Sequence, residues 1–298
     1  MKRTLQYLIT VTVALLASLA VGQAATYTWN GSAPFDWFNP DNWSPSGVPG
    51  AADRAIINSG TVDLTADADV ADLEMRGGTV AGPGSLTISN ALSWTGGTMN
   101  GPGSLVIAAG AQGELAPLGQ VVVDGCRVEN AGTVVWTNSS FYLQSGVWSN
   151  AAGGVLEIQG DYQCWDSDGG SQGEVHNGGL VRKSAGTGTA QFTSVRFRNT
   201  GTLEIESGTL YFDQPYVQTT GSTILRGGNL TTPNGVDIQG GSLGGSGTIT
   251  AKVTCSGLVN PGDPVGVLRI VGEYVQTASA ALTFKWRARS RALSSTSC

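Results

Sequence analysis

Gly77 to Ile88 reads Gly-Gly-Thr-Val-Ala-Gly-Pro-Gly-Ser-Leu-Thr-Ile, and Gly96 to Ile107, nineteen residues later, reads Gly-Gly-Thr-Met-Asn-Gly-Pro-Gly-Ser-Leu-Val-Ile. Nine of the twelve positions are identical, and a looser third copy runs from Gly240 to Ile249. A period near 20 residues that pairs glycine turns with short β-branched runs is typical of a β-solenoid, in which each repeat forms one coil. Nothing in the repeat resembles a reaction centre, so it predicts architecture and not activity.

The composition also favours an all-β protein. The chain has 298 residues, 44 of them glycine, and only 13% are charged, against a usual value of about 25%. Its hydrophobic content of 40% is enough for a core. No long apolar pattern of period 3.6 follows residue 25, so we expect almost no helix.

Short apolar pairs at positions i and i+2 recur along the chain, and each pair points to one face of a strand. They are Leu86/Ile88, Leu105/Ile107, Val121/Val123, Val134/Trp136, Leu156/Ile158, Leu203/Ile205, Leu210/Phe212 and Leu268/Ile270. Their spacing predicts roughly ten or eleven coils and a rod about 50 Å long.

A second recurring phrase is Asn-x-Gly followed by Thr or Leu and an aliphatic residue. It begins at Asn58, Asn130, Asn177 and Asn199. Asparagine and glycine tolerate left-handed backbone conformations, so we expect this phrase to turn the chain into the next strand.

Residues 1–25 have the pattern of a secretory signal peptide. Lys2 and Arg3 precede an apolar run from Leu5 to Leu19, and small residues up to Ala25 close it. The alternative is a membrane anchor, but the run is short for a span of about 20 residues. Loss of the two basic residues changes the formal net charge from −6 to −8. The signal peptide predicts a protein that is secreted or on the cell surface, and the acidic mature chain is not expected to bind nucleic acid or an anionic membrane. No later segment could cross a bilayer as a helix.

Residues 26–59 are rich in tryptophan and precede the repeats, which we expect over residues 60–284. An open solenoid end exposes unpaired strand edges and needs a cap. Trp29, Trp37 and Trp43 are placed to form an aromatic N-terminal cap; the alternative is that these three rings contact carbohydrate. Four further tryptophans are expected in the core or lining a groove: Trp94, Trp136, Trp148 and Trp165.

The cysteines do not form an evident disulfide or metal pattern. Cys126 and Cys164 are 38 residues apart, or about two coils, which separates their Cα atoms by about 10 Å, beyond the disulfide limit of about 7 Å. We therefore expect small buried thiols and neither a metal nor a cofactor.

The N-terminal phrases Trp29-Asn30-Gly31, Asn42-Trp43-Ser44 and Val48-Pro49-Gly50, with Asp53 and Ile56-Ile57, resemble the first module of bacterial secreted β-helix proteins. The C-terminal phrases Leu243–Ile249, Val259–Leu268 and Gly272–Thr277 resemble autotransporter-associated β-strand repeat proteins. Together the resemblance covers most of residues 26–284. It implies a right-handed parallel β-helix of pectate-lyase-like architecture, displayed outside the cell, and it carries over no catalytic residue.

Residues 285–298 break the pattern. This tail contains four basic residues and no acidic one: Lys285, Arg287, Arg289 and Arg291. The glycine-rich repeat pattern ends after Phe284. The codons of this tail can be written so that a reading frame shifted by two nucleotides encodes Gly-Thr-Glu-Phe-Asp-Gln-Leu, a phrase similar to the continuation in the relatives named above. We therefore interpret the tail as frameshifted and the chain as truncated at its C-terminus; the alternatives are a basic docking tail and an ordinary solvated terminus.

Few residues suggest chemistry. The single histidine, His176, precedes a turn phrase and is expected at the edge of a coil, not in a catalytic triad. Two acidic groups could in principle bind Ca²⁺, but neither matches a known calcium loop, and we interpret both as solvated loops. They are Asp67, Asp69, Asp72 and Glu74, and Asp161, Asp166, Asp168 and Glu174.

The function predicted from the sequence is a non-enzymatic extracellular or cell-surface scaffold, stalk or adhesin that contacts extracellular polysaccharide or the cell envelope. No catalytic residue is assigned. One alternative is a polysaccharide-degrading β-helix enzyme, which a row of acids, or of acids with arginine, on one solvent face would favour. The other is a carbohydrate-binding protein. Smooth faces of threonine, serine and asparagine would favour the scaffold.

Overall fold

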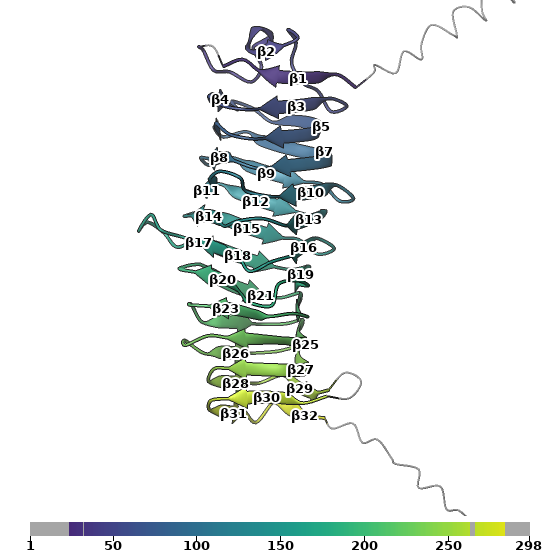
Figure 1. The fold of residues 1–298 in the computed structure, drawn as a ribbon, viewed down its shortest axis with the longest axis vertical. Helices are drawn as coiled ribbons and strands as arrows, with labels where there is room; N and C mark the ends of the chain where they lie inside the picture. Colours follow the sequence, from purple (N-terminus) through teal and green to yellow (C-terminus); the bar gives the residue numbers. More distant parts are fainter. Residues whose placement is uncertain (1–23, 32, 263–265, 284–298) are drawn as a thin grey trace, which may run out of the picture.

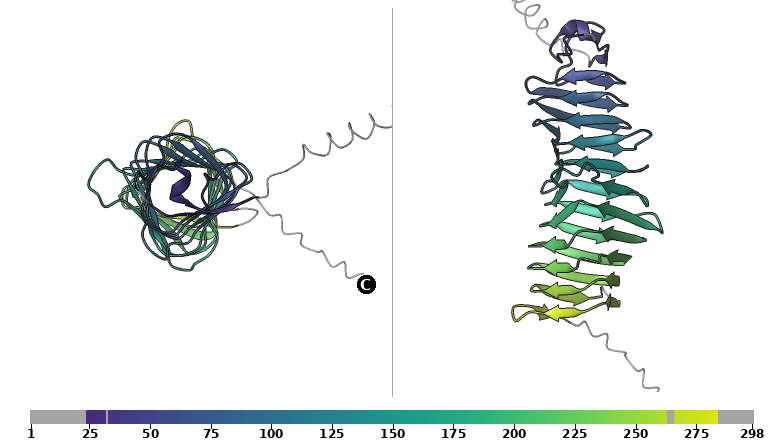
Figure 2. Two further views of the ribbon diagram at one scale, coloured as in Figure 1. Left: turned by 90° about the horizontal axis from the view of Figure 1, so that it is seen from above. Right: turned by 90° about the vertical axis from the view of Figure 1, so that its left-hand side faces the viewer.

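The computed structural model describes residues 24–31, 33–262 and 266–283. Over these residues the chain is an all-β parallel β-solenoid of about 11 turns stacked along one axis (Figure 1). Viewed along that axis the coils superimpose (Figure 2). The fold and the number of coils predicted from the repeat are confirmed. Within the described residues the one helical segment is a 3₁₀ turn at Pro40–Asn42.

Each coil contributes one strand to each of three parallel ladders. Ladder 1 consists of β1 (Thr26–Trp29), β3 (Arg54–Ile57), the second halves of β5 (Ala68–Met75) and β7 (Ser85–Trp94), β10 (Gln112–Leu115), β13 (Thr133–Trp136), β16 (Val155–Ile158), β19 (Leu180–Lys183), β22 (Thr202–Ile205), the first halves of β25 (Ser222–Thr231) and β27 (Ser242–Thr250), β29 (Leu258–Pro261) and β32 (Ala281–Leu282). Ladder 2 consists of β4 (Thr61–Asp63), β6 (Thr79–Ala81), β8 (Gly97–Asn100), β11 (Val121–Asp124), β14 (Phe141–Gln144), β17 (Gln163–Trp165), β20 (Thr189–Thr193), β23 (Thr209–Phe212), the second halves of β25 and β27, and β30 (Leu268–Val271). Ladder 3 consists of the first halves of β5 and β7, β9 (Ser104–Ile107), β12 (Arg127–Asn130), β15 (Val147–Asn150), β18 (Glu174–Asn177), β21 (Arg196–Asn199), β24 (Tyr216–Gln218), β26 (Val236–Ile238), β28 (Val253–Cys255) and β31 (Tyr274–Gln276).

The nineteen-residue repeat corresponds to one coil. Leu86 pairs with Leu105 and Ile88 pairs with Ile107 across β7 and β9, and all four side chains are buried. Burial of one such side chain contributes about 1.5–3 kcal/mol. The same alternation of buried and outward residues continues along all three ladders up to the last coil, where β30, β31 and β32 have no buried residue. The buried residues form one continuous hydrophobic core.

Glycines in the repeat permit close approach of neighbouring coils. Gly78 and Gly97 have φ values of +78° and +96°, and a Cβ at Gly97 would lie 2.7 Å from the carbonyl oxygen of Gly78. The Asn58 phrase agrees with our expectation, because Gly60 has a φ of +86°, but the other three Asn-x-Gly phrases do not. At Gly132 and Gly201 φ is not in the left-handed region, and a Cβ would instead lie 2.3 and 2.2 Å from a carbonyl oxygen of the preceding coil. Glycine is required there by proximity, not by a left-handed turn.

The N-terminal segment is both a first coil and a cap. β1 pairs in parallel with β3 and therefore already belongs to ladder 1. Residues 33–50 fold over the end of the stack, where β2 (Trp43–Ser44) pairs antiparallel with β1. The backbone N–H of Trp37 donates to the carbonyl of Asp63 at 3.0 Å, which ties this excursion to ladder 2.

Cys126, Cys164 and Cys255 are buried free thiols, as the spacing predicted. Most of the proposed signal peptide, all of the basic tail from Lys285 and residues 263–265 of the C-terminal phrase lie outside the described residues. In the part of the chain that the structure describes, no helix is long and apolar enough to span a membrane.

Candidate functional site

The three N-terminal tryptophans are buried. Trp29, Trp37 and Trp43 are 5%, 0% and 1% exposed, and the ring of Trp43 meets the other two edge to face at centroid distances of 5.0 and 4.8 Å. The indole N–H of Trp43 donates to the carbonyl of Trp37 at 2.8 Å. These rings pack against each other as a cap. None of them exposes a face to which the carbohydrate considered from the sequence could bind.

The expectation of a solvated loop is wrong for the first acidic group, because Asp69, Asp72 and Glu74 lie on strand β5 and Glu74 is buried. Glu74 is paired with Arg54 in the preceding coil and with Arg76 on its own coil. Asp72 instead accepts a hydrogen bond from Asn90 Nδ2 in the next coil, at 2.7 Å. These carboxylates connect neighbouring coils and do not converge on one point.

The second acidic group is also divided among different partners. Glu174 lies 2.6 Å from His176 on the same strand and 3.4 Å from Arg196 in the next coil. Burial alone would raise the pKa of Glu174, but these hydrogen bonds and nearby positive charges outweigh it and lower the pKa. His176 thus lies on an outward strand face, as expected. Among the described residues no three His, Cys, Asp or Glu side chains are placed to hold a metal ion.

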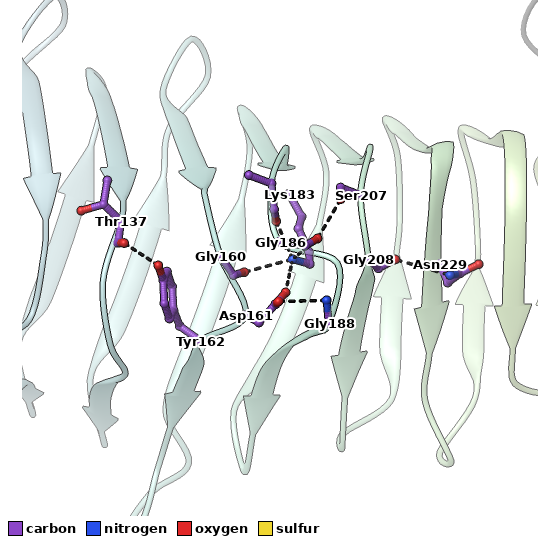
Figure 3. A network of polar contacts seen from close by, with 11 residues as sticks. Thr137, Gly160, Asp161, Tyr162, Lys183, Gly186, Gly188, Ser207, Gly208 and Asn229 are labelled. Carbon is purple, nitrogen blue, oxygen red and sulfur yellow. Dashed lines mark hydrogen bonds and ion pairs between the residues drawn. The ribbon is translucent and has the colours of Figure 1, made fainter.

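Asp161 belongs to a separate polar cluster around Lys183 (Figure 3). The Lys183 side chain is 0% exposed, although the neighbouring inward positions of ladder 1 are Ile158 and Ile205. Its Nζ donates to Asp161 Oδ1 at 2.8 Å and to the carbonyls of Gly160 and Ala185 at 3.0 and 2.7 Å. The cluster connects the turns of two neighbouring coils.

Asp161 completes this connection. Its Oδ2 accepts from the backbone N–H of Gly188 at 2.8 Å. The hydrogen bond from Lys183 is the main reason why the pKa of Asp161 is lowered. All of these partners are internal to the fold, so we interpret the cluster as a structural connection.

The two remaining acids shape the loop between β17 and β18. Asp166 Oδ2 accepts from the backbone N–H of Gly173 at 2.6 Å, and Asp168 Oδ1 accepts from that of Gly170 at 2.8 Å. Desolvation raises the pKa of Asp166, whereas the hydrogen bond from Gly170 is the main cause of a lowered pKa at Asp168. The loop borders a surface depression of about 330 Å³ whose lining includes Ser194.

Charged side chains gather on ladders 1 and 3. On ladder 1 the outward residues Glu157, Arg182 and Glu204 follow one another in successive coils. Arg182 lies 2.7 Å from Glu157, and Arg226 lies 3.0 Å from Glu204. The hydrogen bond to Glu157 is the main cause of a raised pKa at Arg182. This is the row of acids with arginine that would favour an enzyme, but its members are paired with each other.

Ladder 2 has a contrasting outer surface. Its strands β14, β17, β20 and β23, and the halves of β25 and β27 that follow them, contain no charged residue. We call their outward side chains the ladder 2 strip. It consists of Tyr142, Gln144, Gln163, Trp165, Thr189, Gln191, Thr193, Thr209, Tyr211, Asn229, Thr231, Thr248 and Thr250. The strip is therefore a neutral surface of amides, hydroxyls and three aromatic rings.

Trp165 is the most exposed tryptophan of the described residues, at 38%. Its ring lies 5.7 Å from that of Tyr142 in the preceding coil, with 30° between the planes. Trp94, Trp136 and Trp148 are buried in the core, as predicted. Trp165 instead points outward because it alternates with the buried Cys164 along β17.

Sequence reasoning missed a buried amide ladder on ladder 3. Asn130, Asn150, Asn177 and Asn199 occupy successive coils and are joined by side-chain hydrogen bonds of 2.8, 2.9 and 2.8 Å. Gln218 continues the row at 3.3 Å. Three of these residues begin the Asn-x-Gly phrases, so the signal was present; the fourth Asn-x-Gly phrase begins at Asn58, which is exposed.

Comparison of the chain with protein-family models, curated proteins and solved structures found no match.

Proposed function

We propose that this chain is a non-enzymatic extracellular or cell-surface scaffold. It acts as a stalk or adhesin that holds binding partners apart along its length. Supporting this proposal, several of the outer acids on ladder 1 bond to side chains of adjacent coils. Glu157 to Arg182 and Glu204 to Arg226 are examples. Fully exposed ion pairs contribute little individually, about 0–1 kcal/mol, but here the carboxylates are largely covered and the pairs repeat along the rod.

The buried amide ladder supports the same proposal. Every link of the ladder joins one coil to the next, so polar groups inside the rod also hold it along its axis. With a rise of about 4.8 Å per coil, about 11 coils span about 50 Å. The extracellular location rests on the signal-like pattern of residues 1–25.

The experiment follows the full chain in the cells that produce it. We expect the protein in the medium or the envelope fraction, digestible by protease added to intact cells, and able to release no product from neutral or acidic polysaccharides. Retention inside the cells would contradict the location.

A polysaccharide-degrading enzyme is the second candidate, because the Glu157–Arg182–Glu204 row meets the criterion stated from the sequence. The scaffold proposal would be overturned in favour of this one by release of product from a polysaccharide, if Glu157→Gln or Glu204→Gln abolishes that release. Glu129→Gln on ladder 3 should leave it intact. Glu129 is a suitable control because it is also an outward acid paired with an arginine, at 2.7 Å from Arg127.

A further inference from the structure

We propose that the ladder 2 strip binds a neutral polysaccharide, with one sugar ring resting over Thr193 against the indole of Trp165. Thr193 is the partner of Trp165 in the next coil. A threonine is too short to cover an indole, which leaves part of the Trp165 ring accessible on that side. Aromatic faces carry partial negative charge and attract the polarised C–H groups of a pyranose.

Hydrogen-bonding groups surround the same position. Gln163 Nε2 donates to the hydroxyl of Thr193 at 2.8 Å, so its amide oxygen is left to accept from a ligand hydroxyl. Gln191 lies two residues before Thr193 on the same outward face of β20, opposite Tyr211 in the following coil. A sugar over Thr193 would therefore meet an indole in the preceding coil, amides beside it and a tyrosine in the following coil.

The surface continues along the axis beyond Thr193. Beside Thr193, a depression of about 330 Å³ is lined by Ser194 and by residues of the loop that follows Trp165, Asp166 among them. A second depression of about 410 Å³ is lined by Tyr211, Thr231 and Thr250, among others. Trp165 and Tyr211 are two coils apart, which corresponds to about 10 Å along the rod. An extended chain of several sugars fits this path better than a single small molecule.

Charge selects a neutral ligand. The strip itself has no charged residue between β14 and β27, and the acids next to it, Asp166, Asp168 and Asp213, would repel a polyanion. The one cation that lines the second depression, Lys252, is paired with Glu273 at 2.9 Å. A protein partner is less suited, because interface cores concentrate apolar area, whereas here amides and hydroxyls separate the rings. The choice of a glycan rests on the proposed extracellular location, but the binding itself can be measured independently of that location.

The test is affinity electrophoresis of the full chain in native gels that contain hydroxyethyl cellulose, glucomannan or the anionic polygalacturonate. We expect a neutral polysaccharide to retard the protein. Trp165→Ala should weaken this binding about tenfold or more, as truncation of a central aromatic anchor does. Thr193→Gln, which fills the space without adding charge, should weaken it as well. The matched control is Tyr274→Ala, because Tyr274 is 36% exposed but lies on ladder 3.

Circular dichroism establishes that each variant is folded. Absence of retardation by either neutral polysaccharide, or retardation that Trp165→Ala and Thr193→Gln leave unchanged, overturns the proposal while leaving the scaffold role intact. Binding of polygalacturonate alone, lost in Arg198→Ala, would assign ligand binding to the small depression lined by Arg196 and Arg198 and would also overturn it. A concentration-dependent dimer, detected by sedimentation and dissociated by Trp165→Ala, would overturn the proposal as well. The strip would then be a contact between two copies of the chain.

Discussion

Asn150 Nδ2 donates a hydrogen bond to Oδ1 of Asn177, 2.9 Å away in the next coil, and both side chains are 1% exposed. The same Nδ2 contacts the carbonyl oxygens of Gly154 and Leu180 at 3.1 and 3.0 Å. A primary amide has both donors and an acceptor, so one side chain can satisfy the coils on both sides of it. The interior of this rod is therefore joined by directional bonds as well as by apolar packing.

Asn150→Asp tests this relationship with almost no change in volume. The new carboxylate oxygen would face three acceptors, so we expect a loss of about 3 kcal/mol or more in the free energy of unfolding, measured by urea denaturation. The control is Asn58→Asp, at an exposed asparagine outside the buried row, where Oδ1 already accepts from Arg76 at 3.3 Å. Equal losses in the two variants would contradict a special role for the buried row.

Lys183→Met should destabilise the rod although it replaces a buried cation by an apolar side chain of similar length. Three oxygen atoms, those of Gly160, Asp161 and Ala185, would lose their donor, and we expect a cost of about 1–3 kcal/mol. Lys252→Met is the control, since the side chain of Lys252 is 59% exposed and pairs with Glu273 at the surface. A variant as stable as the wild type would show that the cluster contributes nothing net.

The Lys183–Asp161 pair also predicts a pH dependence. The pKa of Asp161 is lowered in the folded state, chiefly by its hydrogen bond from Lys183, so its contribution is present above the ordinary aspartate pKa of 3.8 and is lost as the pH falls through the lowered value. The difference in unfolding midpoint between wild type and Lys183→Met should therefore narrow in acid below about pH 4. A difference that stays constant down to pH 2 would refute this assignment.

The buried thiols should be unreactive in the folded chain. Burial, and to a smaller extent the nearby charge of Asp124, raises the pKa of Cys126 to about 12. Burial also raises the pKa of Cys164 and Cys255. In a Cys298→Ser background, maleimide at pH 7.5 should label the native protein slowly and the urea-unfolded protein at three sites per chain. Rapid labelling without denaturant would mean that the coils open locally.

Two tryptophan variants separate the cap from the proposed binding surface. Trp43→Ala should lower stability by about 3–5 kcal/mol, because it removes a buried ring and leaves a cavity at the end of the stack. Trp165→Ala should change stability by less than about 1 kcal/mol, since its ring is partly exposed. Thermal unfolding followed by circular dichroism measures both, and an order of effects opposite to this one would contradict the roles given to the two rings.

The sequence alone was sufficient for the architecture. The repeat at Gly77 and Gly96 predicted one coil, because the spacing of glycines and apolar pairs is set by a backbone geometry that recurs in every turn. Buried cysteines followed from the same spacing. Asn130, Asn177 and Asn199 were recognised as a pattern, but their lateral hydrogen bonds were not, because the sequence does not reveal which positions share an inward column.

Only the tertiary structure decided which aromatic and charged residues face solvent. Trp43 and Trp165 are chemically identical in the sequence, yet Trp43 is buried within the excursion over the end of the stack, whereas Trp165 points outward from β17 of ladder 2. Lys183 sits in an apolar column because two turns present carbonyl oxygens there. The register between stacked coils brings together residues that are about 20 positions apart in the sequence. The local sequence pattern determines the shape of each coil, but it does not specify which side chains of neighbouring coils come into contact.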